Sequence, residues 1–324
     1  AAEEMSDTEP LSYEQIDAEK VRHTIEQIDQ ALKNKPIDPK KKQKLNYARK
    51  NWPKNLERYD QQQEVMGERK NYSKTDPDAT FMRMKEDYMK NGQLKPGYNL
   101  QISTNNQFIV NYSIHQSSND MTVLNPHIRE FIEQFNMTPH AVIADAGYGS
   151  LENYEFLNQN QIDAYVKYPY FDKEQSKTYN KNPFLIDNLF YNEENDCFYC
   201  PMGQCMTKIG KKKKVTDNGF EQEITLYQAQ NCQRCPLHGL CHKQQGNRVI
   251  GVNHRLRKYK QKVRGNLLSE EGIKHRKQRT HDTEPVFGNI KYNKKFKRFN
   301  LRGKQKVQVE VGLLAIAHNL SKVA

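Results

Sequence analysis

The sequence has no long apolar run and no apolar segment near its start. The longest apolar stretch, residues 311–317, is far shorter than the roughly 20 residues that span a bilayer. Nothing near the amino terminus has the apolar centre of a secretion signal. These absences argue against a membrane protein and against export. We therefore expect a soluble, cytoplasmic protein with no membrane partner.

An initiator Met is also missing, because the chain begins with Ala1 and Ala2, and from this we expect a processed, trimmed or partial product. Negative charge is in deficit: 39 Asp and Glu stand against 51 Lys and Arg, a net charge of +12. This balance favours a polyanion such as nucleic acid as the partner. The basic residues cluster at 40–44, 211–214, 255–262 and 291–306, which suits a phosphate track, although a single run is more often a solvated face.

Cysteine is absent from most of the chain, and all six cysteines lie within one stretch: Cys197, Cys200, Cys205, Cys232, Cys235 and Cys241. Two Cys-x-x-Cys pairs are followed by Cys241 and His242, a spacing at which thiolates, or thiolates with an imidazole, suit tetrahedral zinc. Cys200 and Cys235 each precede a proline, so we predict a structural Zn²⁺ held by Cys200, Cys232, Cys235 and Cys241. Free thiols in a loop-rich insert are the alternative. Disulfides are disfavoured because nothing indicates secretion.

The hydrophobic pattern predicts an α/β protein in four parts. Residues 1–70 are expected to form a helical hairpin insert, broken at Pro36 and Pro39. Residues 71–167 follow the order strand, strand, helix, strand, helix, strand, which is typical of a mixed sheet with flanking helices. The first two strands, β-like runs at residues 98–104 and 108–115, are joined by Asn105-Asn106 and are expected to form a hairpin. Residues 168–252 form a cysteine-rich, zinc-ribbon-like insertion, and basic helices in residues 253–324 complete the core.

One apolar run, residues 141–144, is followed directly by a carboxylate. The run Ala-Val-Ile-Ala is typical of a fully buried strand, and the glycines at 147 and 149 end it. Asp145 would then lie at the carboxyl end of the strand, where open α/β sheets bind ligands. The alternative is an ordinary aspartate that caps the helix beginning near Leu151.

A second acidic block, Glu-Pro-Val-Phe-Gly-Asn-Ile-Lys, occupies residues 284–291. We predict that it begins a helix, because proline is tolerated in a first turn. Glu284 and Lys291 are seven positions apart and would share one face of that helix. A surface helix start with no chemistry is the alternative.

Three segments together resemble the DDE transposases of bacterial insertion sequences: residues 144–150, 284–291 and 315–320. The resemblance covers roughly residues 73–324, is most specific around Glu284, and is to the branch with a cysteine-rich insertion. It implies a ribonuclease-H-like fold in which three carboxylates hold two Mg²⁺ or Mn²⁺ ions. Asp145 matches the second carboxylate, Glu284 the third, and Lys291 the lysine that follows the glutamate.

Two features depart from that family. Its arginine four positions before the glutamate is replaced by Thr280, although Arg276 and Arg279 are close. The Asp-Gly-Thr tripeptide that carries its first aspartate is absent, which implies that this chain begins downstream of the first catalytic strand. Asp76 and Asp78 are the nearby substitutes, but both are typical of a turn beside a proline.

The resemblance implies a DNA transposase that cleaves and transfers strands at insertion-sequence ends, or an inactive fragment of one. A homodimer is one candidate assembly. Phosphate contacts are expected from Lys291, Lys294, Lys295, Lys297 and Arg298. The alternative from another class is a non-enzymatic, zinc-containing nucleic-acid-binding protein. No helix-turn-helix is evident, so the recognised DNA sequence is left open.

Overall fold

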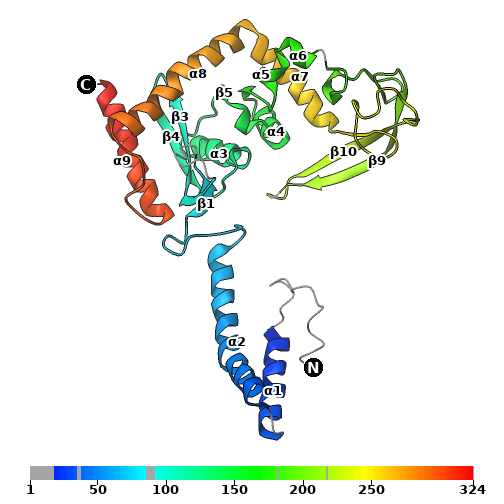
Figure 1. Cartoon of the computed structure of the whole chain (residues 1–324). Coiled ribbons are helices and arrows are strands. Elements are labelled where there is room, and N and C mark those ends of the chain that lie inside the picture. The colour runs from blue at the N-terminus through cyan, green and yellow to red at the C-terminus, as the bar shows by residue number, and fades with distance from the viewer. Residues whose placement is uncertain (1–17, 35–37, 85–91, 181, 217, 324) are drawn as a thin grey trace. The chain divides into compact units, whose positions relative to one another are not determined.

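The computed structural model of the chain describes residues 18–34, 38–84, 92–180, 182–216 and 218–323 (Figure 1). The chain divides between Pro77 and Asp78 into two compact units. The first contains helices α1 (Ala18–Asn34) and α2 (Pro39–Met66). They pack through buried Ile28 and Ala48, and Arg49 pairs with Asp29 at 3.1 Å. The two predicted helices are thus confirmed, whereas the predicted break at Pro36 lies outside the described residues.

The second unit begins with two antiparallel strand pairs. Strand β1 (Thr80–Arg83) pairs with β2 (Leu94–Gly97), and β3 (Asn99–Asn105) pairs with β4 (Phe108–His115). Asn106 and Gln107 connect β3 to β4 with φ values of 49° and 65°, the left-handed backbone that tight hairpins require. The hairpin predicted from two β-like runs around Asn105 and Asn106 is confirmed.

A parallel βαβ unit follows. The short turn η2 (Asp120–Thr122) and helix α3 (Leu124–Phe135) lead to strand β5 (Ala141–Ala144), then to the turn η3 (Ala146–Tyr148) and helix α4 (Leu151–Gln159). Strand β6 (Asp163–Val166) lies parallel to β5. The apolar faces of α3, α4 and β6 meet in one core, in which Leu157 and Val166 are fully buried. The predicted α/β class and the order of these elements are confirmed.

The prediction of a fully buried strand at residues 141–144 is wrong, because every residue of β5 is partly exposed. Within the described ranges, strand β5 pairs with β6 on one side only, and β3 likewise pairs only with β4. Among the described residues, the antiparallel and parallel pairs do not join into one mixed sheet. The ribonuclease-H-like arrangement remains a prediction.

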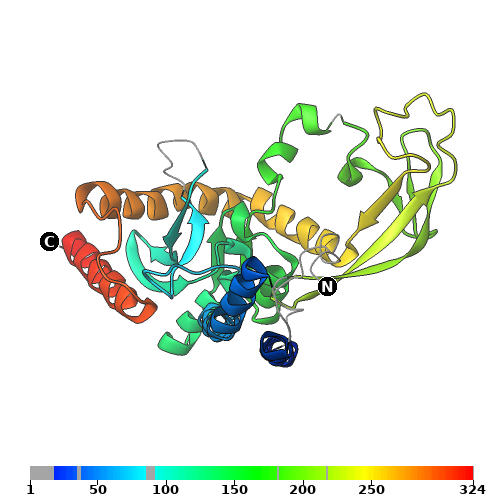
Figure 2. The ribbon, with the colours of Figure 1, turned by 60° about the horizontal axis from the view of Figure 1, so that its bottom comes forward.

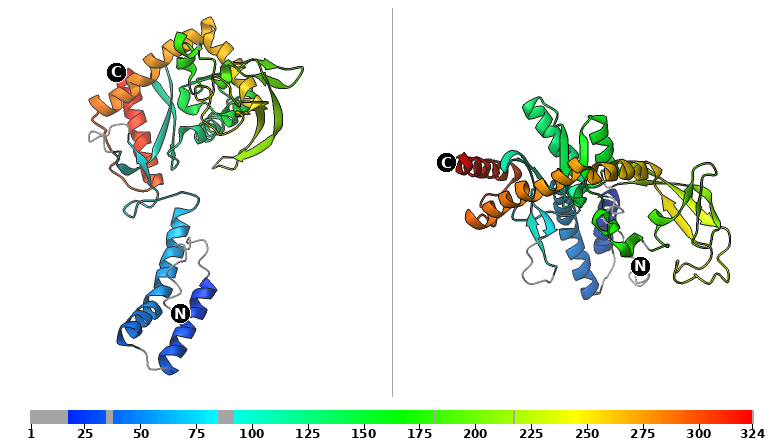
Figure 3. Two further views of the ribbon diagram at one scale, coloured as in Figure 1. Left: turned by 45° about the vertical axis from the view of Figure 1, so that its right-hand side comes forward. Right: turned by 90° about the horizontal axis from the view of Figure 1, so that it is seen from above.

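Three helices complete this unit: α7 (His254–Leu268), α8 (Glu270–Gly288) and α9 (Lys304–Val323). Helix α8 contacts β3, β4, β5 and β6, and so spans both strand pairs, while α9 lies along β4 (Figure 3). The predicted helix start at Glu284 is wrong. Pro285 lies inside α8, and a π-helical turn (Asn289–Asn293) follows directly. Packing of α8 on the strands outweighs the hydrogen bond that a proline removes from a helix interior.

Residues 168–252 carry short helices α5 (Phe171–Glu174) and α6 (Lys177–Asn180), a turn η4 (Ile186–Asn188) and a five-stranded antiparallel sheet. Its strands are β7 (Tyr191–Asn192), β8 (Cys197–Tyr199), β9 (Cys205–Val215), β10 (Glu221–Ala229) and β11 (Val249–Val252). Figure 2 shows β9 and β10 as a long ribbon. The sheet has a core of its own around Phe198, Met206 and Tyr227, all fully buried.

A buried histidine joins α3 to the β3–β4 hairpin. His127 Nε2 lies 2.7 Å from Ser103 Oγ, and its Nδ1 lies 2.6 Å from Ser113 Oγ. Ser113 Oγ also lies 2.7 Å from His115 Nε2. Burial lowers the pKa of both His127 and His115 to about 4, and the charge of Lys304 adds to this effect at His115. Both rings are therefore neutral when the protein is folded near pH 7.

We expect stability to fall as the pH drops from about 6.5 to about 4. In that interval the unfolded chain binds protons at histidines with an ordinary pKa, whereas the folded chain does not, so protonation favours unfolding. His127 alone contributes a slope of up to about 1.4 kcal/mol per pH unit. Urea unfolding across this range measures it. The variant His127→Gln has no titrating ring and should flatten the profile; an unchanged slope would contradict the assignment.

Candidate active site

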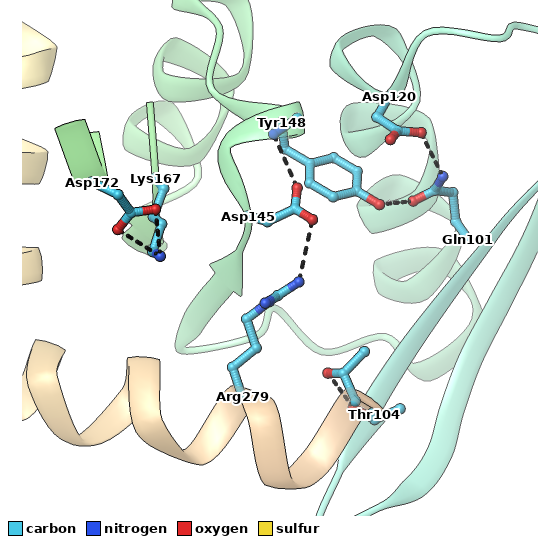
Figure 4. Close-up of polar contacts among 10 residues, drawn as sticks. Gln101, Thr104, Asp120, Asp145, Tyr148, Lys167, Asp172 and Arg279 are labelled. Carbon is cyan, nitrogen blue, oxygen red and sulfur yellow. Dashed lines mark hydrogen bonds and ion pairs between the residues drawn. The ribbon is translucent and has the colours of Figure 1, made fainter. Parts of the chain in front are cut away.

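Asp145 stands at the carboxyl end of β5, as the sequence predicts. Its Oδ1 accepts a hydrogen bond from the amide of Gly147 at 3.0 Å, and its Oδ2 lies 3.3 Å from Arg279 Nη2 of α8 (Figure 4). The Asp145 side chain is 47% exposed. The alternative role as a cap of α4 is wrong, because Ser150 Oγ accepts from Asn153 N there and Asp145 caps only the short turn η3. The carboxylate is therefore open to solvent and to a ligand.

A second carboxylate, Asp120, approaches the same place. A Cβ atom built on Gly147 would lie 3.0 Å from Asp145 Oδ1 and 3.4 Å from Asp120 Oδ2, so Gly147 separates the two groups. Asp120 Oδ1 accepts from Asn99 Nδ2 at 2.8 Å. The sequence analysis missed Asp120, since nothing in its spacing links a turn after β4 to Asp145. Its only signal is an Asn-Asp pair between a strand and a helix.

Tyr148 joins the Asp145 loop to the β3–β4 hairpin. Its hydroxyl donates to Gln101 Oε1 (Figure 4). Gln101 Nε2 in turn donates to Asn99 Oδ1 at 2.6 Å. Burial raises the pKa of Tyr148, and the charges of Asp120 and Asp145 raise it further, so the phenol keeps its proton. The hydrogen bonds from Tyr148 through Gln101 to Asn99 therefore link the loop after β5 to the β3–β4 pair.

Glu284 is exposed on α8. The α8 residue that reaches Asp145 is Arg279, and one turn later Thr283 bonds to Thr104 of β3 at 3.2 Å. In the part of the chain that the structure describes, no group of three or more His, Cys, Asp or Glu side chains is arranged to hold a metal ion as it stands. The side chains near Asp145 are thus the guanidinium of Arg279 and the carboxylate of Asp120. These groups do not make a complete set of metal ligands.

Residues 199–324 match the family model for the transposase DDE domain. Over this segment the chain is similar to DDE transposases, which confirms for these residues the resemblance seen in the sequence. The matched segment contains Glu284 and Lys291, while Asp145 lies before it. No curated protein and no solved structure matches the chain. A transposase acts on DNA, and DDE transposases as a family use divalent metal ions. Throughout the described residues, every helix is too short or too polar to cross a bilayer.

The transposase segment leaves only some of its basic residues open to a partner. Lys295, Lys297 and Arg298 are exposed, whereas Lys291 and Lys294 are half-buried and Lys294 Nζ donates to Ala317 O at 3.3 Å. In α7, Arg255 pairs with Glu155, and Arg257 lies over the Tyr191 and Phe198 rings. Part of the basic charge therefore stabilises the domain itself. The phosphate contacts predicted for residues 291–298 remain a prediction.

The third family segment, residues 315–320, ties α9 to two other elements. His318 is 1% exposed; its Nε2 lies 2.9 Å from Gln107 O, and its Nδ1 lies 3.0 Å from Asn289 Nδ2. Asn319 bonds to both the amide and the carbonyl of Ile109 in β4, at 2.8 and 2.9 Å. This motif holds the end of the Glu284 helix against the β3–β4 turn, so its role in the domain is structural.

Asp76 and Asp78, the predicted alternatives for a first metal ligand, lie on either side of the boundary between the two compact units. Asp78 Oδ2 accepts from the amide of Lys304 at 2.8 Å and so caps α9. Asp76 belongs to the first compact unit. Asp120, which the sequence analysis did not consider, is the carboxylate close to Asp145.

Proposed function

We propose that this chain is a DDE-type DNA transposase that cleaves and transfers DNA strands at insertion-sequence ends, alone or as a homodimer. The single observation that supports this most is Asp145. It is a half-exposed carboxylate at the end of an apolar strand, and α8 of the matched transposase segment packs beside it. A carboxylate that binds a metal ion must be reachable from solvent, and Asp145 is.

The cofactor that we propose is Mg²⁺ or Mn²⁺, with Asp145 and Glu284 as ligands. Carboxylates are the ligands that such hard ions prefer. The fit is partial, because the described residues do not assemble three ligands and Arg279 provides the positive charge beside Asp145. We therefore assign no reaction step to a metal. In this family the ions activate the attacking oxygen and stabilise the leaving one.

The side chains of this chain account for binding and orientation. Lys295, Lys297 and Arg298 present exposed charges to the DNA backbone, which positions a strand without reading its sequence. Arg279 holds the Asp145 carboxylate toward α8, and Gly147 N holds its other oxygen. Both oxygens are thereby oriented before any ligand arrives.

The test is cleavage of a labelled DNA duplex with Mg²⁺ or Mn²⁺ by the full chain and by Asp145→Asn. We expect the variant to lose cleavage by more than the 10- to 100-fold that loss of an outer-shell partner costs. Stability should change by less than about 1 kcal/mol, because the ion pair with Arg279 is exposed to solvent. The matched control is Asp172→Asn, which removes another exposed ion pair, to Lys167, and should cleave normally.

Binding without cleavage by the parent chain would instead support the non-enzymatic nucleic-acid-binding protein or an inactive fragment. Cleavage that survives in both Asp145→Asn and Glu284→Gln would overturn the proposed site.

A further inference from the structure

A small cavity lies between two cysteine-bearing turns of the five-stranded module. It measures about 20 Å³, which is room for a single water-sized body. Its wall includes four of the six cysteines and two histidines: Cys200, Cys232, Cys235, Cys241, His238 and His242. Thiolate and imidazole ligands around a space of one-atom size bind zinc in preference to harder ions such as Mg²⁺.

The two turns are held face to face by hydrogen bonds. Gln204, just after the Cys200 turn, donates from Nε2 to Asn231 O at 2.8 Å and accepts from Asn231 N at 3.1 Å. The Cys232 turn closes through Cys235 N, which donates to Cys232 O at 3.3 Å, with Arg234 at φ 58°. These hydrogen bonds hold the Cys200 turn against the Cys232 turn, and both turns line the cavity.

Hydrogen-bond donors surround the sulfur atoms of the cavity. Arg248 is only 7% exposed; its Nη1 donates to Cys241 Sγ at 3.1 Å, and its amide donates to Cys232 Sγ at 3.4 Å. Arg248 thus places two hydrogen-bond donors against sulfur atoms in the cavity wall, the kind of outer-shell contact that orients metal-binding side chains. His242 has both ring nitrogens buried and without a hydrogen-bond partner among the described residues. Because buried polar atoms are nearly always hydrogen-bonded, the two ring nitrogens of His242 indicate a missing ligand or hydrogen-bond partner.

The remaining two cysteines are accounted for separately. Cys197 of β8 is buried, and its hydrogen bond with Cys205 of β9 raises the pKa of Cys205 to about 11. Neither lines the cavity. Cys197 and Cys205 are therefore matched controls for substitutions of the cavity cysteines, because they are thiols of the same five-stranded module.

We propose that Cys200, Cys232, Cys235 and Cys241 bind one Zn²⁺ as thiolates, with Arg248 and His242 donating hydrogen bonds to the sulfurs. Among the described residues, the four side chains are not arranged as a metal site. We therefore expect them to rotate toward the centre of the cavity when the ion binds. Between β10 and β11, residues 230–248 contain no helix or strand, and Leu240 is 73% exposed. A loop of this length that has no hydrophobic core needs another source of stability, and the bound ion would supply it by cross-linking the loop.

The experiment measures bound zinc per chain in the purified 324-residue chain and in three variants. We expect one zinc in the parent, loss of zinc in Cys235→Ser, and retention in Cys205→Ser and in His242→Ala. Unliganded parent protein, loaded with Co²⁺ under reducing conditions, should show the charge-transfer absorption of tetrahedral cobalt–thiolate and lose it when Zn²⁺ is added. This second measurement needs no variant to fold.

Absence of both stoichiometric zinc and the cobalt–thiolate band in the parent would overturn the proposal. So would zinc that is lost equally from Cys205→Ser and Cys235→Ser, because the site would then not be the cavity. Loss of zinc in His242→Ala would replace the four-thiolate set with a thiolate–imidazole set and refute the assignment made here. None of these results depends on DNA cleavage.

Discussion

Replacement of Gly272 by alanine is expected to destabilise the protein by about 3 kcal/mol or more. Gly272 lies in the first turn of α8, where its amide donates to Ser269 Oγ at 3.0 Å. A Cβ at this position would lie 1.9 Å from Asn266 O and 2.9 Å from Leu267 Cα. Both are backbone atoms of the last turn of α7, so no side chain can move aside and the two helices must separate.

Gly265 offers a control with the opposite sign. It lies inside α7, and a Cβ there would meet nothing within 4 Å. Alanine at this position should stabilise the protein by about 0.5–1 kcal/mol, since it lowers the entropy of the unfolded chain and favours helix. Urea unfolding of both variants measures the pair. Equal effects of the same sign would show that helix propensity, and not the close approach of α7 and α8, governs this junction.

The hydrophobic pattern predicted the elements of the core well because each one carries its own local signal. The β3–β4 hairpin was recognisable from two β-like runs around an Asn-Asn turn, and Asn106 adopts the left-handed backbone that such a turn demands. The pattern could not predict the partners of each strand. Residues 141–144 look like a buried strand, but in the part of the chain that the structure describes β5 pairs only with β6, and it stays partly exposed. Burial depends on neighbours that are distant in sequence.

The site shows the same division between local and distant information. Asp145 was found because an apolar run and two glycines mark the end of a strand. Asp120 and Arg279 were not assigned to it, since their approach depends on how η2 and α8 pack. Pro285 misled the analysis for a related reason. Its local preference favours a helix start, yet the contacts of α8 with four strands keep the helix continuous through it.

His318→Ala is the other substitution with a large expected effect, a loss of about 3 kcal/mol. Gln107 O can only accept, so we assign the ring proton to Nε2, which leaves Nδ1 to accept from Asn289 Nδ2. The truncation removes the partner of a half-buried carbonyl and of a half-buried amide, and it opens a cavity where the His318 ring is 1% exposed; together these losses amount to about 3 kcal/mol. Thermal and urea unfolding measure the loss. Exposed His281 is the control, and its replacement by alanine should change stability by less than about 0.5 kcal/mol.

The consequence reaches the proposed active site through Asn289. This residue directly follows α8, five positions after Glu284, so losing its partner frees the end of the helix that carries Glu284. His318→Ala should therefore reduce DNA cleavage even at a temperature where the variant remains folded. His318→Gln, whose amide can still donate to Gln107 O, should recover part of both losses. His318→Ala could instead unfold more easily but cleave DNA as well as the parent while folded. The hydrogen bond between His318 and Asn289 would then stabilise the fold without positioning Glu284.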